Sequence, residues 1–556
     1  MNWIKTYCAI IAVCLVSTAV CAPHGGEIYE LSQPDGSTVQ VRVYGDEYYQ
    51  YVESLDGYTL IRNPQTGWIE YAQTNEDNSE FVATGVVYDD KVNIDPYHPV
   101  FEPSARQAAG TKWKQDNSDN KKPFIEKRKR LRKEVARQKA LDNMKHIDPR
   151  KYAALTADSS IETFQTISPA GDISAAPVTG SVIGLTILID FSDQPATISQ
   201  AEIEKYCNQP GYTGFSNAGS VYDYFYDVSN GKLQYTNYVT AYYRAKNPKS
   251  YYEGDCSSWG KTSELINEAV RDLDAKGFDF RILSLNGNRV RALNIFYAGN
   301  PSCGWSKGLW PHKGWWSGYT TDEGVSFGDY QMSNIGSSPS IYVFCHENGH
   351  MVCGYPDLYD YGGESSGVGN FCVMCGRPND KKPVPPCGYL RSTTGWETVI
   401  DITNDPAGTL RQLTANANVS LKYTNPNNSK EFFMVESRLK TGRSEVLPAE
   451  GLLIWHIDEA GSNDNQEMTP SSHYKVSLEQ ADGAFHLEKN NNSGDSNDSF
   501  RAGYKDQFDD YTSPDSRWWN GTVSGLSLTQ ISAVSGQMSL VVGASAPVGY
   551  WKFDGN

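Results

Sequence analysis

Two histidines and one glutamate stand at a spacing that can build a metal-dependent hydrolase site. His346, Glu347 and His350 form the pattern HExxH. On a helix, residues four positions apart lie one above the other, so the two imidazoles would point at one spot and could hold a zinc ion. Glu347 could reach a water on that metal and would act there as the general base. The alternative is a helix that carries these residue types without a metal.

The flanking residues favour a helix around this pattern. Ser338 is a suitable N-cap and Pro339 a suitable first helical residue, and Gly354 suits the position just past the C-terminus. Residues 341–344 supply apolar surface. We therefore expect a buried helix whose histidine face is turned toward a cleft.

A catalytic zinc ion usually takes three protein ligands and one water, so a third ligand must follow the two histidines. Asp357 is the nearest candidate, because Gly354 and Pro356 would turn the chain back toward the metal. Asp360 and Glu364 are alternatives that the sequence leaves open. Asp357 is the third ligand that we predict.

These motifs carry a resemblance to a known family. Segments 346–360 and 367–376 are similar to the immune inhibitor A-type metallopeptidases, which are secreted zinc endopeptidases. The likeness extends to further segments on both sides, which are 184–191, 219–225, 229–233, 432–438 and 451–458. The resemblance covers most of residues 26–543. It implies a zincin-like catalytic domain, in which a twisted sheet lies over the HExxH helix, and it implies protein or peptide substrates.

The resemblance also gives Met374 a role, because this residue stands where the family has its methionine turn, a hydrophobic floor beneath the metal. An ordinary core methionine would suit the same position. One departure is that Cys353 stands where such enzymes usually have a glycine, and Gly354 comes one residue later. This departure concerns the assignment of Asp357 and leaves the two histidines unaffected.

A tryptophan-rich loop at 304–316 precedes the predicted helix. It would form either part of the wall of a substrate cleft or a packed aromatic loop, and we favour packing. His312 in this loop and Tyr389 after the methionine turn are candidates to polarise a transition-state oxyanion.

Length and composition predict a multidomain α+β protein. The 556 residues suggest about three or four domains. Residues 1–22, with an apolar run and small residues at the end, are typical of a signal peptide, with a membrane anchor as the alternative. Residues 23–105 contain short tyrosine-rich strands and resemble the family's pro-domain. The basic segment 106–175 is predicted to be a helical linker that is cut on activation of the zymogen.

The remaining chain divides into a predicted catalytic domain at 176–400 and a β-sandwich at 401–545. Residues 546–556 are a linker or the start of a truncated lectin-like domain, which would bring glycan contact to this end. The acidic loop 494–498, with Asp482 nearby, could hold a structural Ca²⁺ ion or be a plain surface loop.

Charge and cysteine content limit the partners and the compartment. The net charge of −17 argues against nucleic acid, and no stretch after the signal peptide is long and apolar enough to span a membrane. Eight of the 11 cysteines follow the signal peptide and all lie in the predicted catalytic domain. An even number of cysteines in a secreted chain suggests disulfides.

We therefore predict a secreted, zinc-dependent endopeptidase made as a zymogen, with Glu347 as its general base. The competing prediction is a catalytically inactive secreted or surface relative that binds protein or glycan. Glu347 separates the two, because a binding protein has no need of the base.

Overall fold

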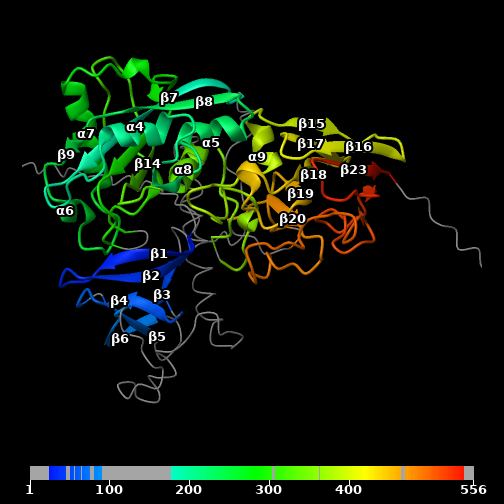
Figure 1. The fold of residues 1–556 in the computed structure, drawn as a ribbon, viewed down its shortest axis with the longest axis horizontal. Coiled ribbons are helices and arrows are strands. Elements are labelled where there is room, and N and C mark those ends of the chain that lie inside the picture. Colours follow the sequence, from blue (N-terminus) through cyan, green and yellow to red (C-terminus); the bar gives the residue numbers. More distant parts are fainter. Residues whose placement is uncertain are drawn as a thin grey trace, which may run out of the picture.

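The computed structural model describes most of the chain, namely residues 24–45, 50–55, 57–63, 65–74, 81–90, 177–303, 307–361, 363–464, 469 and 471–543. The predicted signal peptide, the basic linker at 106–175, part of the tryptophan-rich loop at 304–306 and the segment 546–556 lie outside these residues. The described part is a mixed α+β structure with six α-helices and five sheets (Figure 1). None of its helices is long and apolar enough to cross a membrane.

The N-terminal sheet is an antiparallel meander whose six strands follow the order of the sequence. Its strands are β1 (His24–Ser32), β2 (Thr38–Gly45), β3 (Gln50–Glu53), β4 (Thr59–Arg62), β5 (Ile69–Thr74) and β6 (Phe81–Val87). Val39, Val41 and Val43 are buried at every second position of β2, as expected for a strand with one covered face. Trp310, far along the chain, belongs to the same hydrophobic cluster. The N-terminal sheet therefore packs on the region that follows it.

The second sheet has the strand order β13-β14-β12-β7-β8, in which β9 also pairs with β7 (Gly180–Asp190). The other strands are β8 (Leu233–Val239), β9 (Tyr243–Arg244), β12 (Leu293–Tyr297), β13 (His312–Trp315) and β14 (Asp329–Asn334). All of its pairs are parallel except that β13 runs antiparallel at the edge. A small separate sheet pairs β10 (Leu285–Asn286) with β11 (Arg289–Val290).

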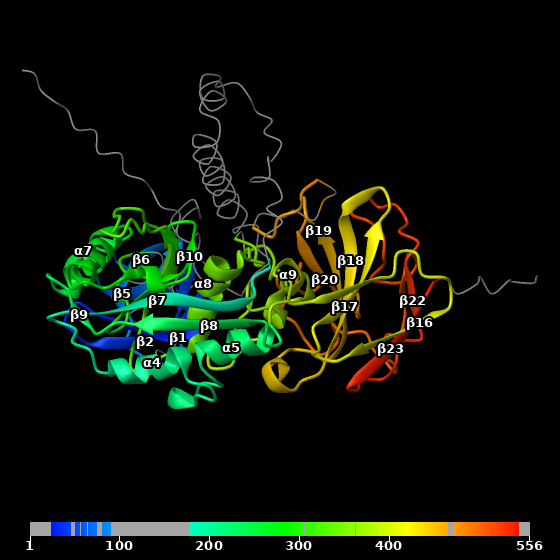
Figure 2. The same ribbon diagram turned by 90° about the horizontal axis from the view of Figure 1, so that it is seen from above.

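Helices cover both faces of this second sheet. They are α4 (Gln200–Asn208), α5 (Val221–Val228), α6 (Lys249–Glu253), α7 (Thr262–Ala275) and α8 (Ile341–Cys353), whereas α9 (Gly388–Thr393) contacts the C-terminal region. Leu188 of β7 packs in one core with α4, α5 and α8, whereas Ile187 and Ile189 pack with α7 on the other face. Figure 2 shows α5 and α7 on opposite sides of β7 and β8. Because both faces are covered, the second half of β7 is an almost continuous apolar run.

The helix that carries HExxH begins two residues later than predicted. Its N-cap is Ser340, whose side chain makes no capping hydrogen bond, and not Ser338. Asn217, in the loop before α5, supplies the cap instead, since its Oδ1 accepts a hydrogen bond from the Ile341 N–H at 3.2 Å. Gly354 ends the helix with φ of 70°, and its predicted left-handed conformation is confirmed.

The C-terminal region contains two further sheets. A five-stranded sheet has the order β15 (Thr398–Asp401), β17 (Val419–Asn425), β18 (Asn428–Arg438), β19 (Gly451–Asp458) and β20 (Val476–Glu479). A four-stranded sheet has the order β16 (Thr409–Thr414), β23 (Gln537–Val542), β22 (Ser527–Thr529) and β21 (Phe508–Asp509). Phe433 and Ile454 share a hydrophobic core with residues of β22 and β23, so the two sheets pack on each other.

The other face of the five-stranded sheet belongs to the core of α8. Met434 and Trp455 lie in the same hydrophobic cluster as Phe344. The boundary that we predicted near residue 400 therefore falls inside a continuous core, and β15 spans it.

Candidate metal centre

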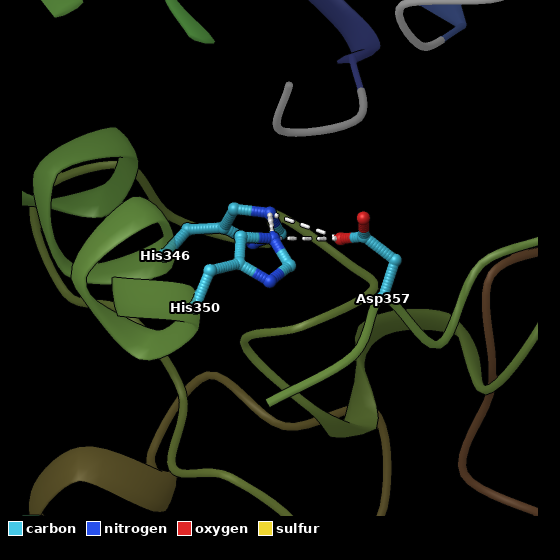
Figure 3. A group of neighbouring side chains, drawn as sticks. All are labelled: His346, His350 and Asp357. Carbon is cyan, nitrogen blue, oxygen red and sulfur yellow. Dashed lines mark hydrogen bonds and ion pairs between the residues drawn. The ribbon is translucent and has the colours of Figure 1, made fainter. Parts of the chain in front are cut away.

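The two histidines and the glutamate of HExxH lie on a helix that is buried on nearly all sides. His346 and Glu347 are fully buried, and the His350 side chain is 7% exposed. His346 and His350 project from one face of α8 toward Asp357, which comes from the loop after the helix (Figure 3). The structure thus brings together all three residues that we predicted as ligands.

The three ligand atoms form a nearly equilateral triangle. The two histidine Nε2 atoms are 3.2 Å apart, and Asp357 Oδ1 lies 3.2 Å from each of them. Metal–ligand bonds of roughly 2.0–2.1 Å in a tetrahedral site place neighbouring ligand atoms about 3.3 Å apart. These three residues could therefore hold one metal ion.

Contacts on the far side of each ligand fix its orientation. His346 Nδ1 donates to the Val373 carbonyl at 2.9 Å, and His350 Nδ1 donates to the Tyr355 carbonyl at 2.6 Å. With the proton on Nδ1, each imidazole turns its Nε2 lone pair toward the centre. The Tyr361 hydroxyl donates to Asp357 Oδ2 at 2.9 Å, which leaves Oδ1 for a metal.

Asp357 is held as an anion. Burial acts to raise its pKa, but the neighbouring imidazoles of His350 and His346 hold the pKa below its ordinary value. Its Oδ1 has no hydrogen-bond partner among the described residues. A buried carboxylate oxygen without a partner is costly unless a cation occupies the place it faces.

The two alternative third ligands lie elsewhere. Asp360 Oδ2 accepts hydrogen bonds from the backbone N–H and the hydroxyl of Ser365, at 3.2 and 2.9 Å. The group of ligand atoms that surrounds the histidines, taken over the described residues, includes Asp357 and neither Asp360 nor Glu364. Gly354 produces the turn that makes this possible, because the helix ends there and the Tyr355 N–H returns to the Gly349 carbonyl at 3.1 Å.

The Glu347 carboxylate makes no hydrogen bond among the described residues. Both of its carboxylate oxygens are buried and lack hydrogen-bond partners in the part of the chain described here. Burial raises the pKa of Glu347 to about 7, against the opposing charges of His346 and His350. A buried acid with a pKa near neutrality can both accept and donate a proton, which is what a general base and acid requires.

A polar network behind α8 was missed by the sequence analysis. Asn348, inside the HExxH pattern, accepts a hydrogen bond from the Tyr235 hydroxyl at 2.7 Å and donates to Asn294 Oδ1 at 2.9 Å. These partners lie on β8 and β12, so the network anchors the helix to the sheet. The sequence signal that could have indicated this network is Asn348 itself, a polar residue at a helix position that must face the core.

Met374 packs against the helix beneath the ligands. It is fully buried, and a Cβ atom added at Gly349 would lie 2.8 Å from its sulfur. Its backbone carbonyl accepts from the Leu358 N–H at 2.8 Å, next to Asp357. Met374 therefore lies under α8, and its backbone carbonyl holds the chain next to Asp357.

The two candidates for oxyanion stabilisation have other surroundings. His312 is buried, its Nδ1 donates to the Trp310 carbonyl at 2.6 Å, and its Nε2 lies 2.9 Å from the Tyr330 hydroxyl. Both of its ring nitrogens are therefore used within the fold. Tyr389 lies in α9 and is buried, with its ring 6.1 Å from that of Phe432.

One disulfide forms among the described cysteines, between Cys256 and Cys303. The remaining described cysteines are buried free thiols, at positions 207, 345, 353, 372, 375 and 387. The expectation of disulfides is met at one pair, and the other thiols are packed as core side chains.

The N-terminal sheet reaches the neighbourhood of the metal centre. Arg377 Nη1 donates to the Tyr29 hydroxyl of β1 at 3.0 Å, and the Tyr29 ring lies 5.7 Å from that of Trp310. The Arg377 guanidinium also stands 5.1 Å from the Tyr342 ring, which lies 5.9 Å from that of His346. A chain of direct contacts therefore joins β1 to the first histidine.

No model of a known protein family matches this chain, and no curated protein is similar to it.

Proposed function

We propose that this chain is a secreted zinc-dependent endopeptidase that hydrolyses peptide bonds in proteins. The observation that carries the proposal is the convergence of His346, His350 and Asp357 beside Glu347, a buried carboxylate whose oxygens have no hydrogen-bond partner among the described residues. The same assignment follows from the resemblance to the immune inhibitor A-type metallopeptidases. The packing of β7 and α8 in one core agrees with the zincin-like domain that this resemblance implies.

Zinc suits this set of donors. Two imidazoles and one carboxylate are typical ligands of a catalytic zinc site, and the triangle of 3.2 Å edges suits its bond lengths. A zinc ion bound there would act as a Lewis acid on the scissile carbonyl and lower the pKa of water.

In this proposal, Glu347 moves the protons of the reaction. Its carboxylate takes a proton from the attacking water and then passes this proton to the leaving amine. A pKa near 7 suits both directions of transfer, and burial excludes competing solvent. His346 and His350 hold their Nε2 lone pairs in place through the carbonyls of Val373 and Tyr355.

We further propose that the N-terminal sheet keeps the precursor inactive. The contacts of Tyr29 with Arg377 and Trp310 support this, because they join the sheet to the surroundings of His346. Cleavage in the basic segment 106–175 would release the sheet. A full-length chain as active as the cleaved one would contradict this part of the proposal.

The decisive experiment compares Glu347→Gln with the wild type, after activation by limited proteolysis, on casein and gelatin. General acid–base catalysis contributes roughly 10²–10⁴-fold, so we expect a loss of kcat/KM in that range with one zinc ion retained. Glu364→Gln is the matched control, since Glu364 also has a carboxylate oxygen without a described partner but lies outside the ligand group. Wild-type protein that holds zinc but cleaves nothing would favour the binding-protein alternative.

A further inference from the structure

A second group of potential metal ligands lies in the loop 480–498, which follows β20. Asp482, His486 and Asp495 each turn one ligand atom toward the others, and these atoms all lie within 4.8 Å of one another. His486 Nδ1 is 3.3 Å from Asp495 Oδ2 and 3.9 Å from Asp482 Oδ2. The side chains are 13 to 34% exposed, so they are partly withdrawn from solvent.

The contact between the imidazole and the carboxylates is not a hydrogen bond. His486 Nδ1 is buried and has no hydrogen-bond partner among the described residues, although Asp495 Oδ2 is only 3.3 Å away. Asp357 Oδ1 shows the same combination, since it lies 3.2 Å from the two imidazoles of α8 without hydrogen-bond geometry. Ligand atoms that point at a shared space are arranged in this way.

A fully buried carboxylate lies next to this group. Asp498 is 0% exposed, and its Oδ2 accepts from the Asp495 N–H at 2.7 Å. Its Oδ1 is buried and has no hydrogen-bond partner in the described part of the chain. A buried carboxylate oxygen without a partner is costly unless a cation or a donor satisfies it.

The loop is held in this shape by its own turns. Asp482 Oδ1 accepts from the Ala484 N–H and Asp495 Oδ1 from the Asn497 N–H, each at 2.8 Å. Because these bonds use the Oδ1 atoms, the Oδ2 atoms are the ones turned toward His486. Asn492 Nδ2 donates to Asp495 Oδ2 at 2.8 Å and steadies it.

The same loop packs on the chain that leads from Asp357 to Met374. The Asn370 N–H donates to the Ser493 carbonyl at 2.8 Å, and the Ser366 N–H donates to the Leu487 carbonyl at 2.7 Å. The Ser366 hydroxyl donates to the Asn492 carbonyl at 2.7 Å. A cation in the loop would therefore also brace the segment that carries the floor of the first centre.

We propose that Asp482, His486 and Asp495 form a second cation site, which binds a divalent ion and fastens the loop 480–498 to the segment 363–376. The ligand types indicate which ion it takes. Carboxylate oxygens suit Ca²⁺ and Mn²⁺, whereas an imidazole suits transition metals. A mixed set therefore favours Mn²⁺ over Ca²⁺. From the acidic residues alone, without His486, a structural Ca²⁺ site and a plain surface loop were both left open here.

The experiment titrates Mn²⁺ into the zinc-loaded full chain and follows free Mn²⁺ by electron paramagnetic resonance. We expect one Mn²⁺ to bind per wild-type chain. Asp495→Asn and His486→Gln each remove a ligand and should weaken this binding by more than the roughly tenfold that loss of an outer contact costs. Both variants should keep their zinc and their circular dichroism spectrum. Asp515→Asn is the matched control, because the exposed Asp515 also caps an N–H two residues on, at 2.9 Å, outside the group.

Two results would overturn the proposal. One is wild-type protein that binds no Mn²⁺ at millimolar concentration, or binds it as tightly as Asp495→Asn does. The other is Ca²⁺ that displaces Mn²⁺ equally well from the wild type and from His486→Gln, since the imidazole would then not be a ligand. Zinc content is read in the same samples, so failure of this site is distinguished from failure of the first centre.

Discussion

The two groups of candidate metal ligands have similar donor atoms, but different elements of the fold hold them in place. In both, an imidazole nitrogen and a carboxylate oxygen lie 3.2 to 3.3 Å apart without hydrogen-bond geometry. The first group takes two ligands from α8 and one from a turn fixed by Gly354, and its side chains are 0 to 7% exposed. The second takes all of its ligands from one loop, with side chains 13 to 34% exposed.

The difference lies in what restrains the ligands from outside. His346 has a partner from a distant part of the chain, the Val373 carbonyl, 27 residues away. The partners of His350 and Asp357 are the Tyr355 carbonyl and the Tyr361 hydroxyl, five and four residues along the chain. The ligands of the loop are restrained by turns two residues long. Catalysis requires ligands held within a few tenths of an ångström, whereas a bracing site tolerates local movement. The comparison thus agrees with a catalytic role for the first group and a structural role for the second.

The largest expected effect concerns the third ligand of the first centre. Structural zinc binding is worth roughly 10–16 kcal/mol, so one of three ligands accounts for about 4 kcal/mol, or roughly a thousandfold in affinity. We expect Asp357→Ala to lose zinc affinity on this scale, measured by competition with a fluorescent chelator. Asp360→Ala and Glu364→Ala should keep the wild-type affinity. Zinc loss in Asp360→Ala and its retention in Asp357→Ala would reverse the assignment.

Removal of the floor under α8 comes next. Met374 is fully buried, and truncation of such a methionine costs roughly 2–5 kcal/mol in the free energy of unfolding. We expect about 3 kcal/mol for Met374→Ala by urea unfolding, together with weaker zinc binding, and less than about 1.5 kcal/mol for Met374→Leu. Met538→Ala, in the core of the C-terminal sheets, should lower stability without affecting zinc. Equal zinc affinity in both alanine variants would show that Met374 is only a core residue.

A third prediction concerns His312, which begins β13 at the edge of the second sheet. Burial lowers the pKa of His312 from 6.5 to about 4, despite its hydrogen bond to the Trp310 carbonyl. The unfolded chain therefore binds a proton that the folded chain does not, and stability is lost as pH falls from 6.5 toward 4. Between pH 7.5 and pH 5 this amounts to about 2 kcal/mol.

We expect His312→Gln to remove this part of the pH dependence, measured as the free energy of unfolding at the two pH values. An unchanged pH dependence in His312→Gln would mean that His312 is protonated in the folded chain.

A feature of this molecule could be predicted from the sequence when residues close together in the chain determine it. The spacing of His346 and His350, and the turn at Gly354 that returns Asp357, are local, and the structure places these residues as predicted. The start of α8 was wrong because its cap comes from Asn217, 124 residues away. The spacing of residues within the helix segment cannot reveal a capping residue so far away in the chain.

Two further features depend on contacts between separate segments. The predicted boundary near residue 400 rests on a change of composition, and β18 and β19, whose two faces are buried, join both neighbouring cores. His486 was missed because loop residues have no periodicity, and its carboxylate partners are determined by how the loop folds. Sequence reasoning succeeded where one helix and one turn determine the geometry, and failed where separate segments meet.

The smallest effect that we predict concerns the hydrogen bond from Tyr361 to Asp357. It is also the most direct test of the difference between the two groups of ligands. Tyr361 donates to Asp357 Oδ2 at 2.9 Å, and loss of such an outer contact costs about tenfold in metal affinity or somewhat more. We expect Tyr361→Phe to weaken zinc binding by about this factor, with little change in the unfolding curve. Tyr224→Phe is the control, since it removes another buried hydroxyl, one bonded to the Val384 carbonyl at 2.9 Å and away from the ligands. If both variants bind zinc as the wild type does, the hydrogen bond from Tyr361 does not restrain Asp357. The two groups of ligands would then differ only in how deeply they are buried.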